Sequence, residues 1–313
     1  MLALTSATGK LGSAVLGALL DNKLIDPKEL VICTSSPAND SRFSHLNALN
    51  IPIRNANFDD PSSLKSAYEG CTRLFLVSTP RIALDYNEAP LWKGREAHHR
   101  AAIDAAVDVG VKHIYYTSLA FGNPSQAGVM RAHIRTEAYL KELESAGKIK
   151  STIIREGLYN ESWPLYFGYY FGLKKETRRQ IYVAGDGPIA WTAIQDLGFA
   201  TAKILASSSD EWAGKTFYLS QKKTWTLETV ARIVSEVRGI DEIVLKLVPR
   251  KEFEDHYVDE KGMERASVEW WSSTYDALRA WECAIDDPTL ERLLEETGRN
   301  PKSLEETISE MLK

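Results

Sequence analysis

The chain has 313 residues, of which 44% are hydrophobic and 26% charged, as in an ordinary globular protein, and this composition argues against a disordered chain. A formal net charge of -5 provides no basic field for a polyanion, so we expect no nucleic-acid partner. Cys33, Cys71 and Cys283 are too scattered for a metal site or a disulfide framework. Without a secretory signal or an apolar run near the ~20 residues that span a bilayer, we expect a cytoplasmic protein with no membrane partner.

Strand-like and helix-like segments alternate along the first half of the chain, which predicts βαβ units and a parallel sheet. Six strands are expected, at residues 2–5, 29–34, 51–55, 73–78, 112–118 and 151–155. Helices are expected over 10–20, from Pro61 to a stop at Gly70, over 94–109 and over 132–146. This order is typical of a Rossmann-type α/β fold with a doubly wound parallel sheet.

The pattern changes after Arg155, where residues 159–171 are dense in aromatic side chains that could cover a pocket. A helix over 194–206 and a strand over 215–219 follow, and the strand is expected to return to the main sheet. Thr226 is predicted to cap one later helix, and Ser303 with Glu306 to form a capping box on the last one. The expected division is a first domain and a smaller, discontinuous α/β second domain, at residues 1–155 joined by 190–222, and at 156–189 plus 223–313.

A glycine-rich turn, Ser6-Ala7-Thr8-Gly9-Lys10-Leu11-Gly12, links the first strand to the first helix. A dinucleotide-binding turn needs small residues where the backbone bends, where it approaches the pyrophosphate, and where the helix packs on the strand. Gly9 and Gly12 meet the second and third needs, and Ser6 can serve at the first if its φ stays negative. Amides at the helix N-terminus would then receive the phosphate charge. We therefore predict a nicotinamide dinucleotide site in the first domain and a substrate site in the second; a purely structural turn is the alternative.

The end of the second strand indicates which dinucleotide is preferred. An acidic residue there accepts a hydrogen bond from the ribose 2′-OH of NAD and repels the 2′-phosphate of NADP. This strand ends Cys33-Thr34-Ser35-Ser36, without a carboxylate, and Arg42 follows shortly after. The pattern favours NADP(H) over NAD(H), although Arg42 could equally be a solvated loop residue.

At this point the chain resembles the NmrA-like family of atypical short-chain dehydrogenases, in particular its quinone oxidoreductase type 2 branch. The likeness covers nearly the whole chain. It is carried by SATGKLGSAV, NFDDPSSL, HIRTEAYLKELESAG running into STIIREGLYNES, GDGPIAWTAIQDLGFATAKIL and the tail LERLLEETGRNPKSLEETI.

The resemblance implies a set of cofactor contacts. Thr8, Gly9, Lys10, Leu11 and Gly12 match the phosphate turn, and Thr34, Ser35 and Arg42 lie where the 2′ end of the adenosine is sensed. Asn57 and Phe58 match an Asp-aromatic pair beside the adenine, with asparagine as a departure, and Ser78 and Thr79 follow the fourth strand along the nicotinamide half. Glu156, Leu158 and Tyr159 fall where the family usually reads Pro-Gly-x-Tyr or similar, and glutamate is unusual there.

The residues for catalysis are less clear from the sequence. Short-chain dehydrogenases use a Tyr-xxx-Lys pair on the helix after the fifth strand, where this chain has His133 and Glu137. The spacing does occur at Tyr170/Lys174, Tyr218/Lys222 and Tyr257/Lys261, but all three pairs lie beyond the sixth strand.

We instead predict His133 as proton donor or ligand-orienting group, because imidazole titrates near neutral pH, and Ser118 as the holder of a substrate oxygen. Tyr159 completes the catalytic set. Tyr159, Trp163, Tyr166 and Tyr169 could stack on a planar substrate. His133 could also simply bind the nicotinamide ribose, and the aromatic run could be core or interface. The pairs His98-His99 and Trp270-Trp271 lack partners at metal-ligand spacing and are assigned to structure, so no metal is expected.

Two functions remain open. The first is an NAD(P)H-dependent oxidoreductase that reduces a quinone, enone or carbonyl of an apolar small molecule, with the cofactor supplying most of the chemistry. The alternative is a non-catalytic NAD(P)-binding redox sensor of the NmrA type, which would act on a regulatory protein partner. A sugar-nucleotide epimerase shares the fold but normally keeps the Tyr-xxx-Lys pair, and a homodimer stays open.

Overall fold

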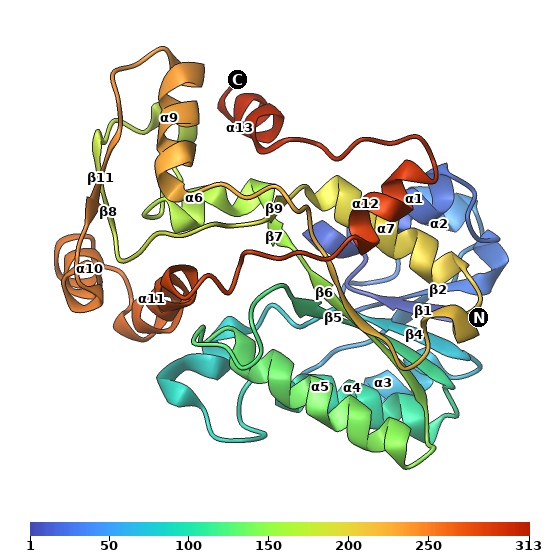
Figure 1. The fold of residues 1–313 in the computed structure, drawn as a ribbon. Helices are drawn as coiled ribbons and strands as arrows, with labels where there is room; N and C mark the ends of the chain where they lie inside the picture. The colour runs from blue at the N-terminus through green and yellow to red at the C-terminus, as the bar shows by residue number, and fades with distance from the viewer.

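Seven parallel strands form the central sheet of the protein, whose computed structural model describes residues 1–313. The strand order is β10-β6-β5-β4-β1-β2-β3 (Figure 1). The strands are β1 (Leu2–Thr5), β2 (Leu30–Thr34), β3 (Ile53–Asn55), β4 (Arg73–Leu76), β5 (His113–Leu119), β6 (Lys150–Glu156) and β10 (Thr216–Leu219). All neighbours pair in parallel, so the predicted Rossmann-type sheet is confirmed, and the strand at 215–219 does join it.

Helices cover both faces of the sheet (Figure 1). One face carries α1 (Lys10–Asp21) and α7 (Ile194–Ala206), and the other carries α3 (Pro61–Tyr68), α4 (Glu96–Asp108) and α5 (Met130–Ser145). Successive strand residues point to opposite faces. Leu4 and Ile154 accordingly join the α1/α7 core, and Ala3 and Ile153 join the other. Two short helices, α2 (Ser44–Ala48) and α8 (Ser209–Trp212), complete this lobe.

The second lobe has its own core around two small parallel pairs of strands. The pairs are β8 (Gln180–Val183) with β11 (Val244–Leu247), and β7 (Leu158–Tyr159) with β9 (Trp191–Thr192). Its helices are α6 (Trp163–Tyr166), α9 (Leu227–Arg238), α10 (Arg250–Asp255), α11 (Arg265–Arg279) and α13 (Leu304–Leu312). Both expected caps form, because Thr226 accepts from the Thr229 amide and Ser303 with Glu306 makes a capping box.

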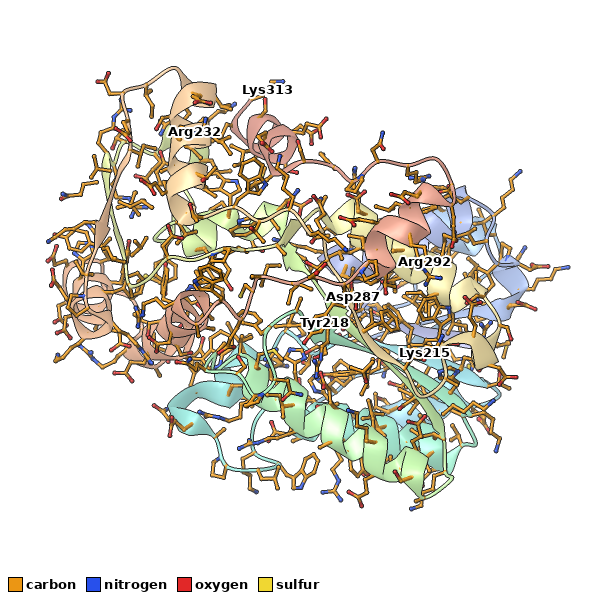
Figure 2. All side chains as sticks on the ribbon, in the orientation of Figure 1. Lys215, Tyr218, Arg232, Asp287, Arg292 and Lys313 are labelled. Carbon is orange, nitrogen blue, oxygen red and sulfur yellow. The ribbon has the colours of Figure 1, made fainter.

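The C-terminal segment is not confined to the second lobe. Leu290, Leu293 and Leu294 of α12 (Thr289–Glu295) belong to the core that contains α1 and α7, although residues 223–313 were expected in the second domain. Just before α12, Asp287 accepts a 3.0 Å hydrogen bond from the Tyr218 amide of β10 (Figure 2). The division at the expected boundaries therefore stays a prediction. No helix combines the length and the apolar character needed to cross a bilayer.

The contact between α1 and α7 leaves no room for a side chain at Gly198. A Cβ there would lie 2.6 Å from the Cβ of Ala14 and 2.7 Å from its carbonyl carbon. We expect Gly198→Ala to force the helices apart and lower the free energy of unfolding by about 2 kcal/mol, as overpacked cores do. Urea unfolding followed by circular dichroism measures this. Gly17→Ala is the matched control, because a Cβ there meets only the Asp21 carboxylate at 3.8 Å. Equal stability of both variants would contradict the prediction.

Candidate functional site

A cleft of about 380 Å³ runs over the carboxyl ends of β1, β2 and β4. Most of the predicted cofactor contacts line it, namely Ser6, Thr8, Gly9, Lys10, Leu11, Gly12, Thr34, Ser35, Asn57, Phe58, Ser78, Thr79 and Tyr159. Ser36, named with the end of the second strand, also lines it, and sequence reasoning missed Asp59 and Arg81 in the same wall. Asp59 follows β3 and Arg81 follows β4. Their position shortly after a strand end was the signal that could have identified them. We call this space the long cleft.

The phosphate turn in the long cleft is held by one close backbone approach. Ser6 has φ +55°, so the expectation that it keeps a negative φ is wrong; its carbonyl turns back and accepts a 2.8 Å bond from the Gly9 amide. A Cβ on Gly12 would collide with that carbonyl, so the turn requires glycine there. Helix α1 starts on Gly9 without a side-chain cap or an acidic residue in its first turn. Its first amides are therefore free for an anion, which fits a pyrophosphate.

Near the end of β2, Arg42 is held by an ion pair and is not among the residues that line the long cleft. Its Nη2 binds Asp40 at 2.8 Å and Ser36 Oγ at 3.0 Å. This ion pair lowers the pKa of Asp40 to about 2. Sequence reasoning overlooked this carboxylate, which neutralises the arginine expected to favour NADP. Nearby, Phe58 stacks on His98 with ring centroids 5.8 Å apart, which supports the structural assignment of that histidine.

A smaller cleft of about 190 Å³ continues from the long cleft and shares Val77, Ser78, Thr79, Pro80 and Tyr159 with it. We call it the inner cleft. The other residues of its wall are Arg95, Thr117, Ser118, Leu119, His133 and Glu156. The structure thus brings together the predicted His133, Ser118 and Tyr159, and adds Arg95, the N-cap residue of α4, which sequence reasoning missed.

A buried chain of hydrogen bonds fixes the tautomer of His133. The Thr79 amide donates to Nε2 of His99 at 3.1 Å, so His99 carries its proton on Nδ1, facing Thr136 Oγ1 at 2.8 Å. The Tyr116 hydroxyl also faces this protonated Nδ1 at 3.3 Å and so cannot donate to it, which leaves its proton for Nδ1 of His133 at 2.9 Å. His133 accordingly holds its proton on Nε2, in the wall of the inner cleft.

His133 is uncharged in this setting. Complete burial and the charge of Arg95 hold the pKa of His133 well below its usual value. The expectation of an imidazole that titrates near neutral pH is therefore wrong, because water cannot solvate the imidazolium. A neutral ring with Nε2–H can still donate a hydrogen bond, which leaves His133 as an orienting group.

The hydroxyl proton of Ser118 is already used in a hydrogen bond within the protein. Its Oγ donates to Glu137 Oε1 at 2.6 Å, and Glu137 forms a paired contact with Arg155 at 3.1 and 2.7 Å. The ionised carboxylate can only accept, so Ser118 presents lone pairs to the inner cleft. Ser118 can therefore receive an N–H or O–H of a ligand, and the expected donation to a substrate oxygen is not available in this geometry.

Arg95 supplies the positive charge of the inner cleft. Its Nε binds Asp85 at 2.6 Å, its amide binds the same carboxylate at 2.8 Å, and Nη2 donates to the Val129 carbonyl at 3.0 Å. Nη1 lies 3.5 Å from Ser78 Oγ, on the side of the inner cleft. The guanidinium is 5% exposed, so it acts in a medium where charge is weakly screened.

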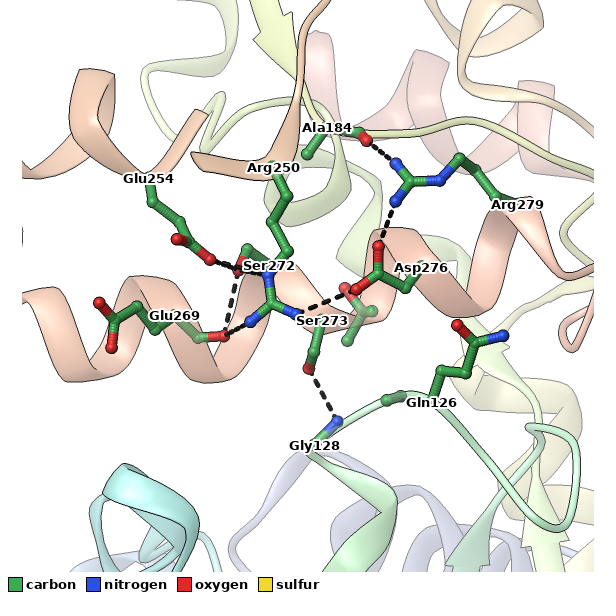
Figure 3. A network of polar contacts seen from close by, with 12 residues as sticks. Gln126, Gly128, Ala184, Arg250, Glu254, Glu269, Ser272, Ser273, Asp276 and Arg279 are labelled. Carbon is green, nitrogen blue, oxygen red and sulfur yellow. Dashed lines mark hydrogen bonds and ion pairs between the residues drawn. The ribbon is translucent and has the colours of Figure 1, made fainter. Parts of the chain in front are cut away.

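Asp85 and Trp270 also line an outer cavity of about 530 Å³ between the two lobes. Its wall is mostly charged and polar, including Arg131, Arg250 and Glu254. Arg250 is held by Glu254 at 2.8 Å and by Asp276 at 3.0 Å, and the Gly128 amide bridges to Ser273 Oγ at 2.8 Å (Figure 3). None of the aromatic residues 159–171 that were expected to cover a pocket lines this cavity.

The aromatic run lies mainly elsewhere. Trp163 and Tyr166 are fully buried in the core of the second lobe, and Tyr169 packs against that core. Their position gives substrate stacking no support, whereas Tyr159 lines both clefts. The three Tyr-xxx-Lys spacings are also structural in their contacts: Tyr257 donates to the Gly168 carbonyl at 2.9 Å, Tyr218 to the Phe121 carbonyl at 3.2 Å, and Tyr170 binds Arg238.

The remaining predicted contact, Leu158, lies in β7 beside Tyr159 and packs in the second core. Glu156 ends β6 and is completely buried. Thr201 of α7 donates to its Oε1 at 2.9 Å, while Oε2 has no hydrogen-bond partner. Burial raises the pKa of Glu156 to about 8, so it is a neutral acid at pH 7.

Comparison with known proteins gives consistent matches. The sequence profile of the NmrA-like family matches residues 1–269. Quinone oxidoreductase 2 of Escherichia coli is 31% identical over 245 residues, which are 76% of this chain and 75% of that protein. An NmrA-like family domain-containing oxidoreductase of Aspergillus flavus is 29% identical over 99% of this chain and 94% of its own length.

Two crystal structures share the fold over the full length of both chains. Triphenylmethane reductase of Citrobacter sp., complexed with NADP(H), superposes with a TM-score of 0.80 at 25% identity. The NADPH-dependent quinone oxidoreductase of Escherichia coli, complexed with NADPH, does so with a TM-score of 0.79 at 27% identity. The resemblance seen in the sequence is confirmed.

The turn provides a direct test of the long cleft. We expect Gly12→Ala to displace the Ser6 carbonyl and the first amides of α1, and so to weaken NADPH binding at least about tenfold, the loss of roughly one charge-assisted hydrogen bond. Fluorescence titration of NADPH measures the affinity. Gly17→Ala, one and a half turns further along α1, should bind like the wild type. An unchanged affinity of Gly12→Ala would show that the dinucleotide does not use this turn.

Proposed function

Because the chain belongs to the NmrA-like family, we propose that it is an NAD(P)H-dependent oxidoreductase that reduces a quinone, enone or carbonyl group of a small molecule. The observation that carries the proposal is the inner cleft, which continues the long cleft from the phosphate turn to His133, Ser118 and Arg95. Relatives whose names state quinone or triphenylmethane reduction with NADP(H) support it.

The residues of the long cleft would hold the cofactor, with the first amides of α1 at the pyrophosphate and Ser78 and Thr79 toward the nicotinamide. When bound, the cofactor supplies a hydride to the acceptor. His99 holds the segment after β4 in place, because it accepts a hydrogen bond from the Thr79 amide and lies 3.1 Å from Ser78 Oγ. Ser118, with its proton committed to Glu137, accepts from a ligand N–H or O–H.

Negative charge develops on the acceptor oxygen as hydride arrives, and two groups can meet it. The Nε2–H of His133 and the Arg95 guanidinium are fixed donors in a buried wall. Preorganised donors of this kind stabilise an oxyanion without first having to reorient. Quinone reduction needs no strong acid, which suits a cleft whose histidine is neutral. The polar outer cavity favours an acceptor that carries polar substituents over the purely apolar one expected from the aromatic run.

We propose NADP(H) as the preferred cofactor. Ser35 and Ser36 place hydroxyl groups in the cleft wall where NAD-binding proteins carry an acid. The Arg42–Asp40 pair is exposed, with 56% of the arginine side chain accessible, and such pairs contribute little stability. A doubly charged 2′-phosphate would therefore compete well with Asp40 for the guanidinium.

A redox sensor remains the second candidate. Its supporting observation is that Glu137, where the lysine of the usual pair would stand, is bound to Arg155 and Ser118. A protein that binds both oxidation states without turnover would need no such lysine. The turnover experiment below separates the two functions.

Purified protein mixed with NADPH and a panel of quinones and aldehydes should consume the reduced cofactor, followed by its near-ultraviolet absorbance. We expect His133→Phe to lower kcat/KM by about 100-fold, because it removes one preorganised donor to the developing oxyanion. His45→Phe on the exposed helix α2 is the control and should leave the rate unchanged. NADPH binding with no turnover of any acceptor would favour the sensor.

Arg42→Ala tests the cofactor preference. We expect the Kd for NADPH to rise about tenfold, as for loss of one charge-assisted contact, while the Kd for NADH stays the same. Arg232→Ala on α9, which removes an equally exposed arginine from the second lobe, should change neither value. A wild-type protein that binds NADH as tightly as NADPH would contradict the preference.

A further inference from the structure

Glu156 has an arrangement that neither hydride delivery nor packing explains. It is the last residue of β6, in the wall of the inner cleft, and none of its side chain is exposed. Thr201 Oγ1 donates to Oε1 at 2.9 Å, and the hydroxyl of Thr201 has no second proton to offer. Oε2 is buried without any partner in the protein. One polar atom in the cleft wall is therefore left for a ligand to satisfy.

No positive group nearby balances a carboxylate at this position. Arg155, the preceding residue, points to the opposite face of the sheet and pairs with Glu137 of α5. The strands beside Glu156 present Leu119 and Leu219 in register with it, and α7 presents Thr201. The other titratable groups of the inner cleft are Tyr159, neutral His133 and Arg95, and Arg95 is held by Asp85.

This arrangement places the acid proton on a defined oxygen. The Thr201 hydroxyl makes no other hydrogen bond, so it donates its proton to Oε1, and a neutral Glu156 then carries its own proton on Oε2. A protonated Oε2 is a hydrogen-bond donor with no acceptor in the protein, which is costly for a buried group unless a bound molecule supplies the acceptor. The matching atom is a carbonyl oxygen.

We propose that Glu156 acts as a neutral carboxylic acid that donates Oε2–H to the carboxamide oxygen of the nicotinamide, and so determines the preference for reduced over oxidised cofactor. This inference rests on the proposed function, because it requires a nicotinamide cofactor in the inner cleft. The reduced ring is uncharged and tolerates a neutral neighbour. The oxidised ring is positive, so an ionised Glu156 would attract it.

The sign of the pH dependence follows from this assignment. Binding of NADPH is stronger with the protonated acid, so its affinity is nearly constant up to about pH 7 and falls as pH rises through the folded pKa of about 8. Binding of the oxidised cofactor gains from the carboxylate, so its affinity rises over the same range. The ratio of the two affinities should therefore shift toward the oxidised cofactor above pH 8.

The experiment measures Kd for NADPH and for NADP⁺ by fluorescence quenching between about pH 6.5 and 9.5, in the full-length protein. For the wild type we expect NADPH binding to weaken about fivefold from pH 7 to 9, roughly the value of one neutral hydrogen bond. Glu156→Gln keeps a donor of the same shape but cannot ionise, so its affinities should be flat with pH. Glu161→Gln, in the loop after β7 and outside the inner cleft, is the matched control and should keep the wild-type profile.

Glu156→Leu keeps the bulk but removes the donor, and should bind NADPH about fivefold more weakly at every pH. Calorimetry in two buffers of different ionisation enthalpy adds a second readout: near pH 8, NADPH binding should take up protons in the wild type and none in Glu156→Gln. If Glu156→Leu fails to fold, the isosteric Glu156→Gln decides the question alone.

A pH dependence that persists in Glu156→Gln would overturn the inference, because the proton would then belong to another group. Wild-type affinity in Glu156→Leu would overturn it as well. A wild-type protein that binds neither nicotinamide would instead refute the proposed function itself. The two failures are therefore distinguishable.

Discussion

The approach of the Ser6 carbonyl to Gly12 is the constraint on which the rest of the site depends. It lets α1 begin directly above the end of β1, with its first amides uncapped. The same helix then meets α7 with no gap, since Gly198 lies against Ala14. Helix α7 in turn carries Thr201, which holds Glu156 in the inner cleft. The left-handed φ of Ser6 is a local strain of about 1 kcal/mol or more, which the surrounding packing offsets.

The charged groups around the inner cleft differ from those of the usual Tyr-xxx-Lys arrangement. Glu137 stands where the usual pair has a lysine, and its negative charge is balanced by an ion pair with Arg155. His133 stays neutral. The positive group is instead Arg95, the N-cap residue of α4, which Asp85 holds in place. Each of these substitutions is compensated by a neighbour. The cleft thus retains donors and one cation without a residue whose proton leaves easily at neutral pH.

The sequence predicts most of the first lobe and two helix caps of the second because these signals are local. Strand runs, the Gly9 and Gly12 turn, and the Thr226 and Ser303 caps all depend on residues within a few positions. The side-chain contacts of Arg42 and Ser118 could not be predicted in this way. Each depends on a single partner, Asp40 or Glu137, whose geometry a sequence pattern does not specify. For the aromatic run the sequence left a pocket wall and a core position open, because its partners, such as Tyr275 and Phe253, lie about 100 residues later.

The acid and the base in the wall of the inner cleft, Glu156 and His133, are both uncharged. With His133 neutral and Glu156 protonated, the Arg95–Asp85 pair is the main fixed charge beside the inner cleft. The two charges of this pair lie on different sides: Arg95 is next to Ser78, and Asp85 lines the outer cavity. The pair therefore creates an electric field with its positive end at the inner cleft. Such a field favours negative charge inside the inner cleft, where an acceptor would gain it, and costs no reorganisation because both partners are buried. The lack of charge on His133 and Glu156 and the proposed field of the Arg95–Asp85 pair therefore have the same origin, the exclusion of water from the strand ends.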